Sequence, residues 1–112
     1  MKKIEAIIRP ESLEAVRNAL GEAGVTGLMI SEIEGHGKQK GVIQQWRGEK
    51  YKVELLPKAR IEIIVKDEDT ERIVGTILES ARTGEIGDGK IFIYPVETAI
   101  RIRTGEKGEK AL

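Results

Sequence analysis

The chain has 112 residues, which fits one domain, and its nineteen basic and nineteen acidic residues cancel. This balance argues against nucleic-acid or membrane-surface binding, which requires a basic excess. The absence of cysteine excludes disulfides and thiolate zinc sites. With no signal peptide and no apolar run of about 20 residues, we expect a cytoplasmic protein. A domain of this size buries less than ~70 % of its unfolded surface, so oligomerisation would be a plausible supplement.

The first third of the chain predicts a strand, a helix and a second strand. Alternating apolar residues predict a strand at Lys2–Arg9. Pro10 suits the first turn of a helix. Apolar residues then recur at steps of three and four from Leu13 to Ala23, which predicts a one-sided helix that Gly24 ends. A second strand is predicted from Thr26 to Glu34.

Residues 35–53 break all periodicity. They contain four glycines, many cations and two isolated aromatic residues, Trp46 and Tyr51. A connection of this length without regular structure is uncommon inside a compact domain and is typical of a functional or disordered segment. We therefore expect a long regulatory loop, in which Trp46 either packs on the molecule's own surface or contacts a partner.

The second half of the chain repeats the order of the first. A strand is predicted at Ala59–Lys66, and Asp67 can cap the helix that follows. The helix carries one apolar stripe, made of Ile73, Val74, Ile77, Leu78 and Ala81. A fourth strand is predicted from Lys90 to Val96.

Two strand–helix–strand halves predict an α+β, ferredoxin-like split βαβ sandwich: an antiparallel four-stranded sheet with both helices on one face. Neighbouring apolar pairs, Ile7-Ile8 and Ile63-Ile64, place isoleucines on the face without helices. Exposed there, they would form a patch that drives association. We therefore expect a homo-oligomer packed through this sheet face.

Residues 82–90 form a glycine-rich connector between the second helix and the fourth strand. Gly84, Gly87 and Gly89 allow consecutive N–H groups to point into one concavity, and Lys90 adds a cation, so the segment suits an oligophosphate. It is not a complete P-loop, because Ile91 replaces the Ser or Thr that would hold Mg²⁺. An ordinary turn, stabilised by Asp88, is the alternative interpretation.

The C-terminal arm and tail cover residues 101–112. We expect a short extended piece from Thr98 to Arg103, with Arg101 and Arg103 on one side. These arginines are either a phosphate-binding pair or a solvated strand face. The charged tail from Thr104 to Leu112 is expected to be mobile.

The whole chain, taken as a single domain of residues 1–112, resembles the PII nitrogen-regulatory signal-transduction family. The segments that carry the resemblance are GHGKQKG at 35–41, RGEKY at 47–51, LPK at 56–58, ARTG at 81–84, GDGKIF at 87–92 and RIRTGE at 101–106. The resemblance implies a homotrimer with nucleotide sites between neighbouring subunits. The resemblance implies that these sites bind either ATP or ADP, and that Mg²⁺ and 2-oxoglutarate bind together with ATP.

The resemblance also implies roles for individual residues. The nucleotide-binding residues would be Ile7, Gly35, Gly37, Lys38, Gln39, Ile64, Gly87, Asp88, Gly89, Lys90, Arg101 and Arg103. Those for 2-oxoglutarate would be Gln39, Lys40, Gly41 and Lys58, with Gln39 also binding Mg²⁺ through its carbonyl oxygen. From the residues alone, Lys58 would be a solvated charge after Pro57.

Two residues depart from the family pattern, and one matches a modified position. Met29 stands where a threonine often bonds the base, and His36 stands where phenylalanine is frequent. Tyr51 matches a tyrosine that some bacterial relatives have uridylylated. Residues 37–53 would contact an ammonium transporter or nitrogen-metabolism enzymes. The protein would associate with a membrane only by binding such a transporter.

The primary hypothesis is therefore a non-enzymatic sensor that binds no nucleic acid. One alternative is a small phosphate-handling enzyme on the same fold, which would need a catalytic base near the glycine-rich connector. The other is a metal-binding structural trimer, which would leave Lys90, Arg101 and Arg103 unexplained.

Overall fold

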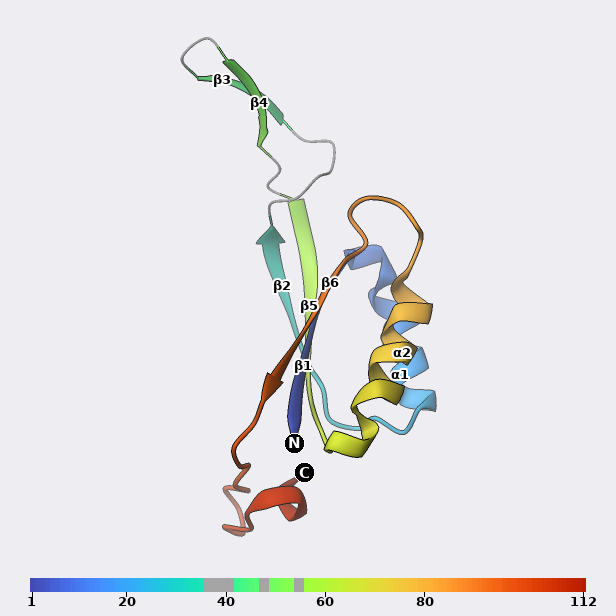
Figure 1. Ribbon diagram of the computed structural model, residues 1–112, viewed down its shortest axis with the longest axis vertical. Coiled ribbons are helices and arrows are strands. Elements are labelled where there is room, and N and C mark those ends of the chain that lie inside the picture. Colours follow the sequence, from blue (N-terminus) through green and yellow to red (C-terminus); the bar gives the residue numbers. More distant parts are fainter. Residues whose placement is uncertain (36–41, 47–48, 54–55) are drawn as a thin grey trace.

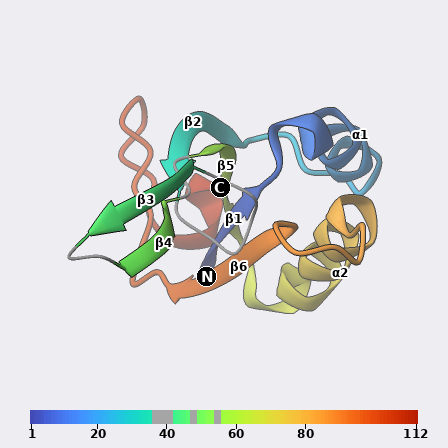
Figure 2. The same cartoon turned by 90° about the horizontal axis from the view of Figure 1, so that it is seen from above.

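The computed structural model describes residues 1–35, 42–46, 49–53 and 56–112, with side chains for 1–34 and 56–112. It forms a four-stranded antiparallel sheet in the order β2–β5–β1–β6, with both helices on one face (Figures 1 and 2). The ferredoxin-like prediction is confirmed. The elements of this sandwich are β1 (Lys2–Ile8), α1 (Leu13–Glu22), β2 (Met29–Gly35), β5 (Leu56–Val65), α2 (Thr70–Ala81) and β6 (Gly89–Pro95).

The core lies between the helices and the two central strands. Alternation along β1 and β5 turns every second side chain toward the helices. Each helix adds its apolar stripe, so the core contains Ile4, Ala6, Ile8, Val16, Leu20, Ala59, Ile61, Ile63, Val65, Ile73, Ile77 and Ala81. This burial confirms the periodicities read from the sequence for most positions, but in the predicted stripe of α2 Val74 is only partly buried and Leu78 is 41 % exposed.

One of the predicted helix ends is observed in the structure, and another is not. Gly24 has φ +89° just beyond α1, the left-handed conformation that ends a helix. Asp67 does not cap α2, because a 3₁₀ turn at Asp67–Asp69 intervenes and the helix begins at Thr70. The Asp67 carboxylate instead lies 2.9 Å from the amino group of Met1.

Residues 35–53 contain regular structure that the sequence analysis did not predict. Strand β3 (Val42–Trp46) pairs antiparallel with β4 (Glu49–Val53), with Val42 opposite Val53. β-branched and aromatic residues favour such strands, but the polar residues interleaved with them leave no apolar alternation in the sequence that would indicate strands. The prediction of a loop without regular structure is therefore wrong.

The sheet face without helices is more polar than predicted. Ile7 and Ile64 are only half-buried there, but alternation places four charged side chains beside them. The Lys3 ammonium lies 3.9 Å from the Glu5 carboxylate and 4.0 Å from that of Glu62, and Arg60 Nε lies 3.3 Å from Glu62. The face is thus an ion-pair network with apolar residues around it; Ile7 and Ile64 lie there as predicted, and association through this face stays a prediction.

The C-terminal segment is neither extended to Arg103 nor unstructured beyond it. The Arg101 N–H donates to the Glu106 carbonyl at 2.9 Å, and the Gly105 N–H donates back to the Arg101 carbonyl at 2.7 Å. The chain therefore reverses within residues 101–105, and Gly105 supplies the positive φ of +73° that this turn requires. A 3₁₀ helix at Gly108–Ala111 follows.

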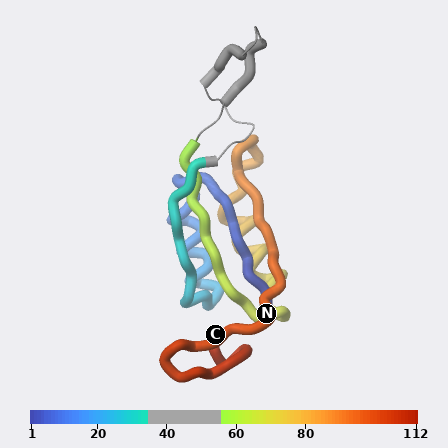
Figure 3. The backbone as a smooth tube through the Cα atoms, turned by 90° about the vertical axis from the view of Figure 1, so that its left-hand side faces the viewer, coloured from blue at the N-terminus to red at the C-terminus, as the bar shows by residue number. Residues whose placement is uncertain are grey.

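The sheet has two ends that carry different loops (Figures 1 and 3). At the loop end, β1 ends at Ile8, β2 ends at Gly35 and β6 begins at Gly89, beside the glycine-rich connector. At the arm end, β5 ends at Val65 and β6 ends at Pro95, next to the C-terminal arm. Among the described residues, no helix is long and apolar enough to cross a membrane.

Candidate functional site

The glycine-rich connector, residues 82–90, joins α2 to the start of β6 and has a backbone conformation that depends on its glycines. Gly84 has φ +89° and Gly87 has φ +105°, and Gly89 at the start of β6 has φ +108°. A Cβ at Gly89 would lie 1.7 Å from the Ile7 carbonyl oxygen, so the connector passes directly against β1. Only glycine fits there.

The Asp88 carboxylate holds this connector together. One oxygen accepts the N–H groups of Thr83 at 2.8 Å and Gly84 at 2.9 Å, and the other accepts the Thr83 hydroxyl. The Thr83 hydroxyl bond is the main cause that holds the pKa of Asp88 far below its usual range. The prediction that Asp88 stabilises the turn is confirmed, and such a carboxylate is a poor general base.

Two cations fix the connector from the neighbouring strands. Arg9, just beyond β1, donates from Nη2 to the Ile86 carbonyl at 2.7 Å and from Nε to Asp88 at 3.2 Å. The Lys58 ammonium donates to the Gly87 carbonyl at 3.2 Å, and Lys58 is only 7 % exposed. A solvated Lys58 is therefore wrong. Arg9 is a site residue that the sequence analysis missed, because its partners lie almost eighty positions away.

Arg9 and Lys58 bind the carbonyls of Ile86 and Gly87, so the N–H groups of the same peptide units point in the opposite direction. Within the described residues, the N–H groups of Gly87 and Asp88 have no hydrogen-bond partner. The side chain of Lys90 is exposed, and Lys90 pairs across the strands with Ile7, so both lie at the loop end. Unpaired N–H groups beside a cation form a nest that suits a phosphate.

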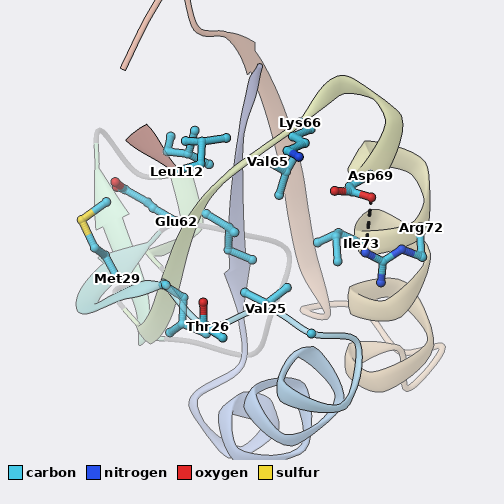
Figure 4. A pocket seen from close by; sticks show the side chains of 15 residues that line it. Val25, Thr26, Met29, Glu62, Val65, Lys66, Asp69, Arg72, Ile73 and Leu112 are labelled. Carbon is cyan, nitrogen blue, oxygen red and sulfur yellow. Dashed lines mark hydrogen bonds and ion pairs between the residues drawn. The ribbon is translucent and has the colours of Figure 1, made fainter. Parts of the chain in front are cut away.

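A hollow lies at the arm end, between residues 24–29, the end of β5 and the start of α2. It has a volume of about 570 Å³ and includes Ile64 among its lining residues. Figure 4 shows Met29 and Glu62 on the side of this hollow away from Asp69 and Arg72. Met29 is 58 % exposed, so it offers an apolar surface where a hydrogen-bonding side chain was expected from the resemblance.

The C-terminal arm adjoins this hollow. Leu112 lines it, and the backbone oxygen of Leu112 accepts a hydrogen bond from Arg101 Nη2 at 3.5 Å. Arg103 is exposed on the same arm. Arg101 and Arg103 thus lie with Ile64 and Met29, and not with the glycine-rich connector.

One copy of the chain does not bring all the predicted residues together. Ile7 pairs with Arg60 in β5, whereas Ile64 lies four residues further along that strand, which is a separation of roughly 13 Å. The loop end collects Ile7, Gly35, Lys58, Gly87, Asp88, Gly89 and Lys90; the arm end collects Met29, Ile64, Arg101 and Arg103. A ligand that touches both groups in one chain would have to span the sheet.

Several predicted residues lie outside the part of the chain that the structure describes. These are Gly37, Lys38, Gln39, Lys40 and Gly41, together with His36. Tyr51 lies in β4, where only the backbone is described. Within the described residues, no group of three or more His, Cys, Asp or Glu side chains comes together, so the Mg²⁺ prediction still rests on Gln39 and the ligand's own phosphates.

Comparisons with known proteins agree over nearly the whole chain. A family model described as "Nitrogen regulatory protein P-II" matches residues 1–106. The chain is 55 % identical over 112 residues to "Nitrogen regulatory protein P-II 2" of Methanothermobacter thermautotrophicus, which covers 100 % of this chain and 97 % of that protein. It is 54 % identical to "Nitrogen regulatory protein P-II" of Microchaete diplosiphon and 52 % identical to that of Pasteurella multocida, in both cases over 100 % of each chain.

Proposed function

The chain belongs to the nitrogen regulatory protein P-II family, and on this premise we propose that it is a non-enzymatic sensor of ATP, ADP and 2-oxoglutarate. A nitrogen-regulatory signalling role is common to the family. In this proposal the chain also forms a homotrimer and controls partner proteins.

The phosphate part of the proposal rests on the connector. A ligand such as ATP carries about four negative charges and needs cations and N–H donors in one place. The N–H groups of Gly87 and Asp88 face away from the carbonyls that Arg9 and Lys58 hold. With Lys90 beside them, they form a preorganised nest, which saves the cost of ordering a loop when the ligand binds.

The separation of the two residue groups is the single observation that carries the proposal. Ile7 and Lys90 lie at one end of the sheet, whereas Ile64 and Arg101 lie at the other. A complete nucleotide cleft therefore requires the loop end of one copy and the arm end of another. A head-to-tail contact of this kind closes into a ring when the rotation permits, and a homotrimer is the ring that we propose.

The oxo-acid would bind beside the phosphates. Lys58 is a buried ammonium next to the Gly87 carbonyl, so a carboxylate placed against the connector would meet a cation with little competing water. In this proposal Gln39 completes the site with Mg²⁺, and Lys40 and Gly41 supply further contacts. These three residues belong to the same connection between β2 and β5 that would signal to partners.

The output of the sensor would be the segment 37–53. Gly35 pairs with Leu56 where β2 and β5 leave the sheet, so both ends of the segment start from the loop end that holds the connector. Ligands can shift its conformation only if they bind its forms with different affinities. We propose that these forms differ in affinity for an ammonium transporter or a nitrogen-assimilation enzyme.

The enzyme alternative is less well supported. It requires a base near the phosphates, and the Asp88 carboxylate of the connector already accepts hydrogen bonds from Thr83, Gly84 and Arg9. Rapid turnover of ATP by the pure protein would favour that alternative. The structural-trimer alternative would be favoured if no adenine nucleotide bound.

Calorimetry separates these possibilities. We expect ATP and ADP to bind in competition, and 2-oxoglutarate to bind to protein saturated with ATP and Mg²⁺ but not to protein saturated with ADP. Absence of any nucleotide binding would overturn the proposal as a whole. Equal oxo-acid binding in both nucleotide states would overturn the role of the ATP-bound metal site.

A further inference from the structure

We infer that Glu106 is an internal competitor for Arg101, so that the C-terminal arm limits nucleotide affinity until the ligand displaces it. This inference rests on the proposed function, because it concerns regulation of the same nucleotide cleft.

The Arg101 guanidinium already donates hydrogen bonds to acceptors in its own arm. Its Nη1 donates to Glu106 Oε1 at 3.0 Å, and its Nη2 donates to the backbone oxygens of Lys110 at 3.2 Å and Leu112 at 3.5 Å. The Glu106 carboxylate and two backbone oxygens thus surround the side chain that the proposed cleft needs for a phosphate. An arginine binds phosphate best through two parallel N–H groups of its fork.

The arm is built to hold Glu106 in place. The Thr104 hydroxyl donates to Glu106 Oε1 at 2.9 Å and accepts the Glu106 N–H at 3.2 Å. The turn is closed by the backbone bonds between Arg101 and Glu106 and between Gly105 and Arg101. Glu106 is therefore fixed as the acceptor next to Arg101, and its position does not depend on a flexible side chain alone.

The contact is weak enough to be displaced. The side chains of Arg101 and Glu106 are 36 % and 41 % exposed, so water and salt screen their attraction. A triphosphate brings several charges and stronger hydrogen bonds to the same guanidinium. Its binding therefore exchanges one anionic partner of Arg101 for another, and the loss of the first partner lowers the net affinity.

The test compares two variants that change the same charge in the same arm. Glu106→Gln removes the carboxylate that contacts Arg101, and Glu109→Gln removes one that has no contact with Arg101 within the described residues. ATP binding is measured by calorimetry at one salt concentration. We expect Glu106→Gln to tighten ATP binding by about two- to fivefold relative to Glu109→Gln.

A second background makes the test specific. In Arg101→Ala protein, Glu106→Gln should no longer change ATP affinity, because the partner for which it competes is absent. Equal affinities of the two Gln variants, weaker binding by Glu106→Gln, or an unchanged gain in the Arg101→Ala background would each overturn the competition. If the wild-type protein binds no ATP, the proposed function itself fails, which is a different result from the loss of the competition alone.

Discussion

Arg9 Nε lies 3.2 Å from Asp88 Oδ1 and joins the end of β1 to the glycine-rich connector across 79 positions of sequence. Asp88 in turn accepts hydrogen bonds from Thr83 and Gly84, so this ion pair links β1 to the part of the connector that Asp88 holds. In the proposed site, neither side chain has to touch the nucleotide. Both act by fixing the backbone that would.

Replacement of Arg9 by alanine should weaken ATP binding by about tenfold, because the Ile86 carbonyl and Asp88 lose their charged donor. Arg9→Lys should recover only part of this loss, since lysine cannot donate to both partners through a planar fork. Calorimetry measures the affinities, and Arg17→Ala on the exposed side of α1 is the control. An Arg9→Ala protein with wild-type affinity would contradict the positioning role.

The lowered pKa of Asp88 predicts a specific acid sensitivity. Since the folded-state pKa lies below the ordinary value of 3.8, the unfolded state takes up the proton first, and stability falls as the pH drops below about 4. Asp88→Asn should melt at a lower temperature than the wild type at pH 7. The difference should shrink at pH 3, and a difference that stays constant with pH would contradict the assignment.

Gly89→Ala should be strongly destabilising, by about 2–4 kcal/mol, because its Cβ would overlap the Ile7 carbonyl and its φ is +108°. Gly84→Ala is the matched control, since Gly84 has φ +89° but open space around its Cβ position. It should cost only about 1 kcal/mol. Urea unfolding measures both values, and equal costs would show that the close approach to β1 is not needed.

Lys58→Ala should abolish 2-oxoglutarate binding and change ATP affinity by less than about threefold. The reason is that Lys58 contacts the Gly87 carbonyl of the connector and not the N–H groups proposed to bind phosphate, whereas the proposed oxo-acid would need its charge. Lys66→Ala, which removes an exposed lysine beyond the other end of β5, is the control. Retention of oxo-acid binding by Lys58→Ala would contradict the assignment.

The sandwich could be predicted because its signals are local. Alternation of Ile4, Ala6 and Ile8 and the helical spacing of Ile73 and Ile77 follow from burial on one face. The β3–β4 hairpin and the turn at 101–105 could not be predicted in this way, because the sequence of neither segment shows a regular apolar spacing.

The site was only partly predictable for a related reason. The glycines and Lys90 stand together in the sequence, so the connector could be recognised. The partners of the connector could not, since Arg9 and Lys58 reach it only through the fold. The distance between Ile7 and Ile64 could be known only from the strand register, because the sequence shows both simply as isoleucines on the helix-free face.

The central claim is that each nucleotide cleft joins the loop end of one copy to the arm end of another. Lys90→Glu damages the loop end and Arg101→Glu the arm end, and each variant alone should weaken ATP binding by about tenfold or more. Mixed oligomers of the two variants, purified through different tags, contain interfaces where an intact loop end meets an intact arm end.

Calorimetry with ATP on these mixed oligomers is therefore the most direct measurement. We predict that a fraction of their sites binds ATP with wild-type affinity, which neither pure variant can show. Mixed oligomers that bind ATP no better than the two pure variants would contradict a cleft shared between copies.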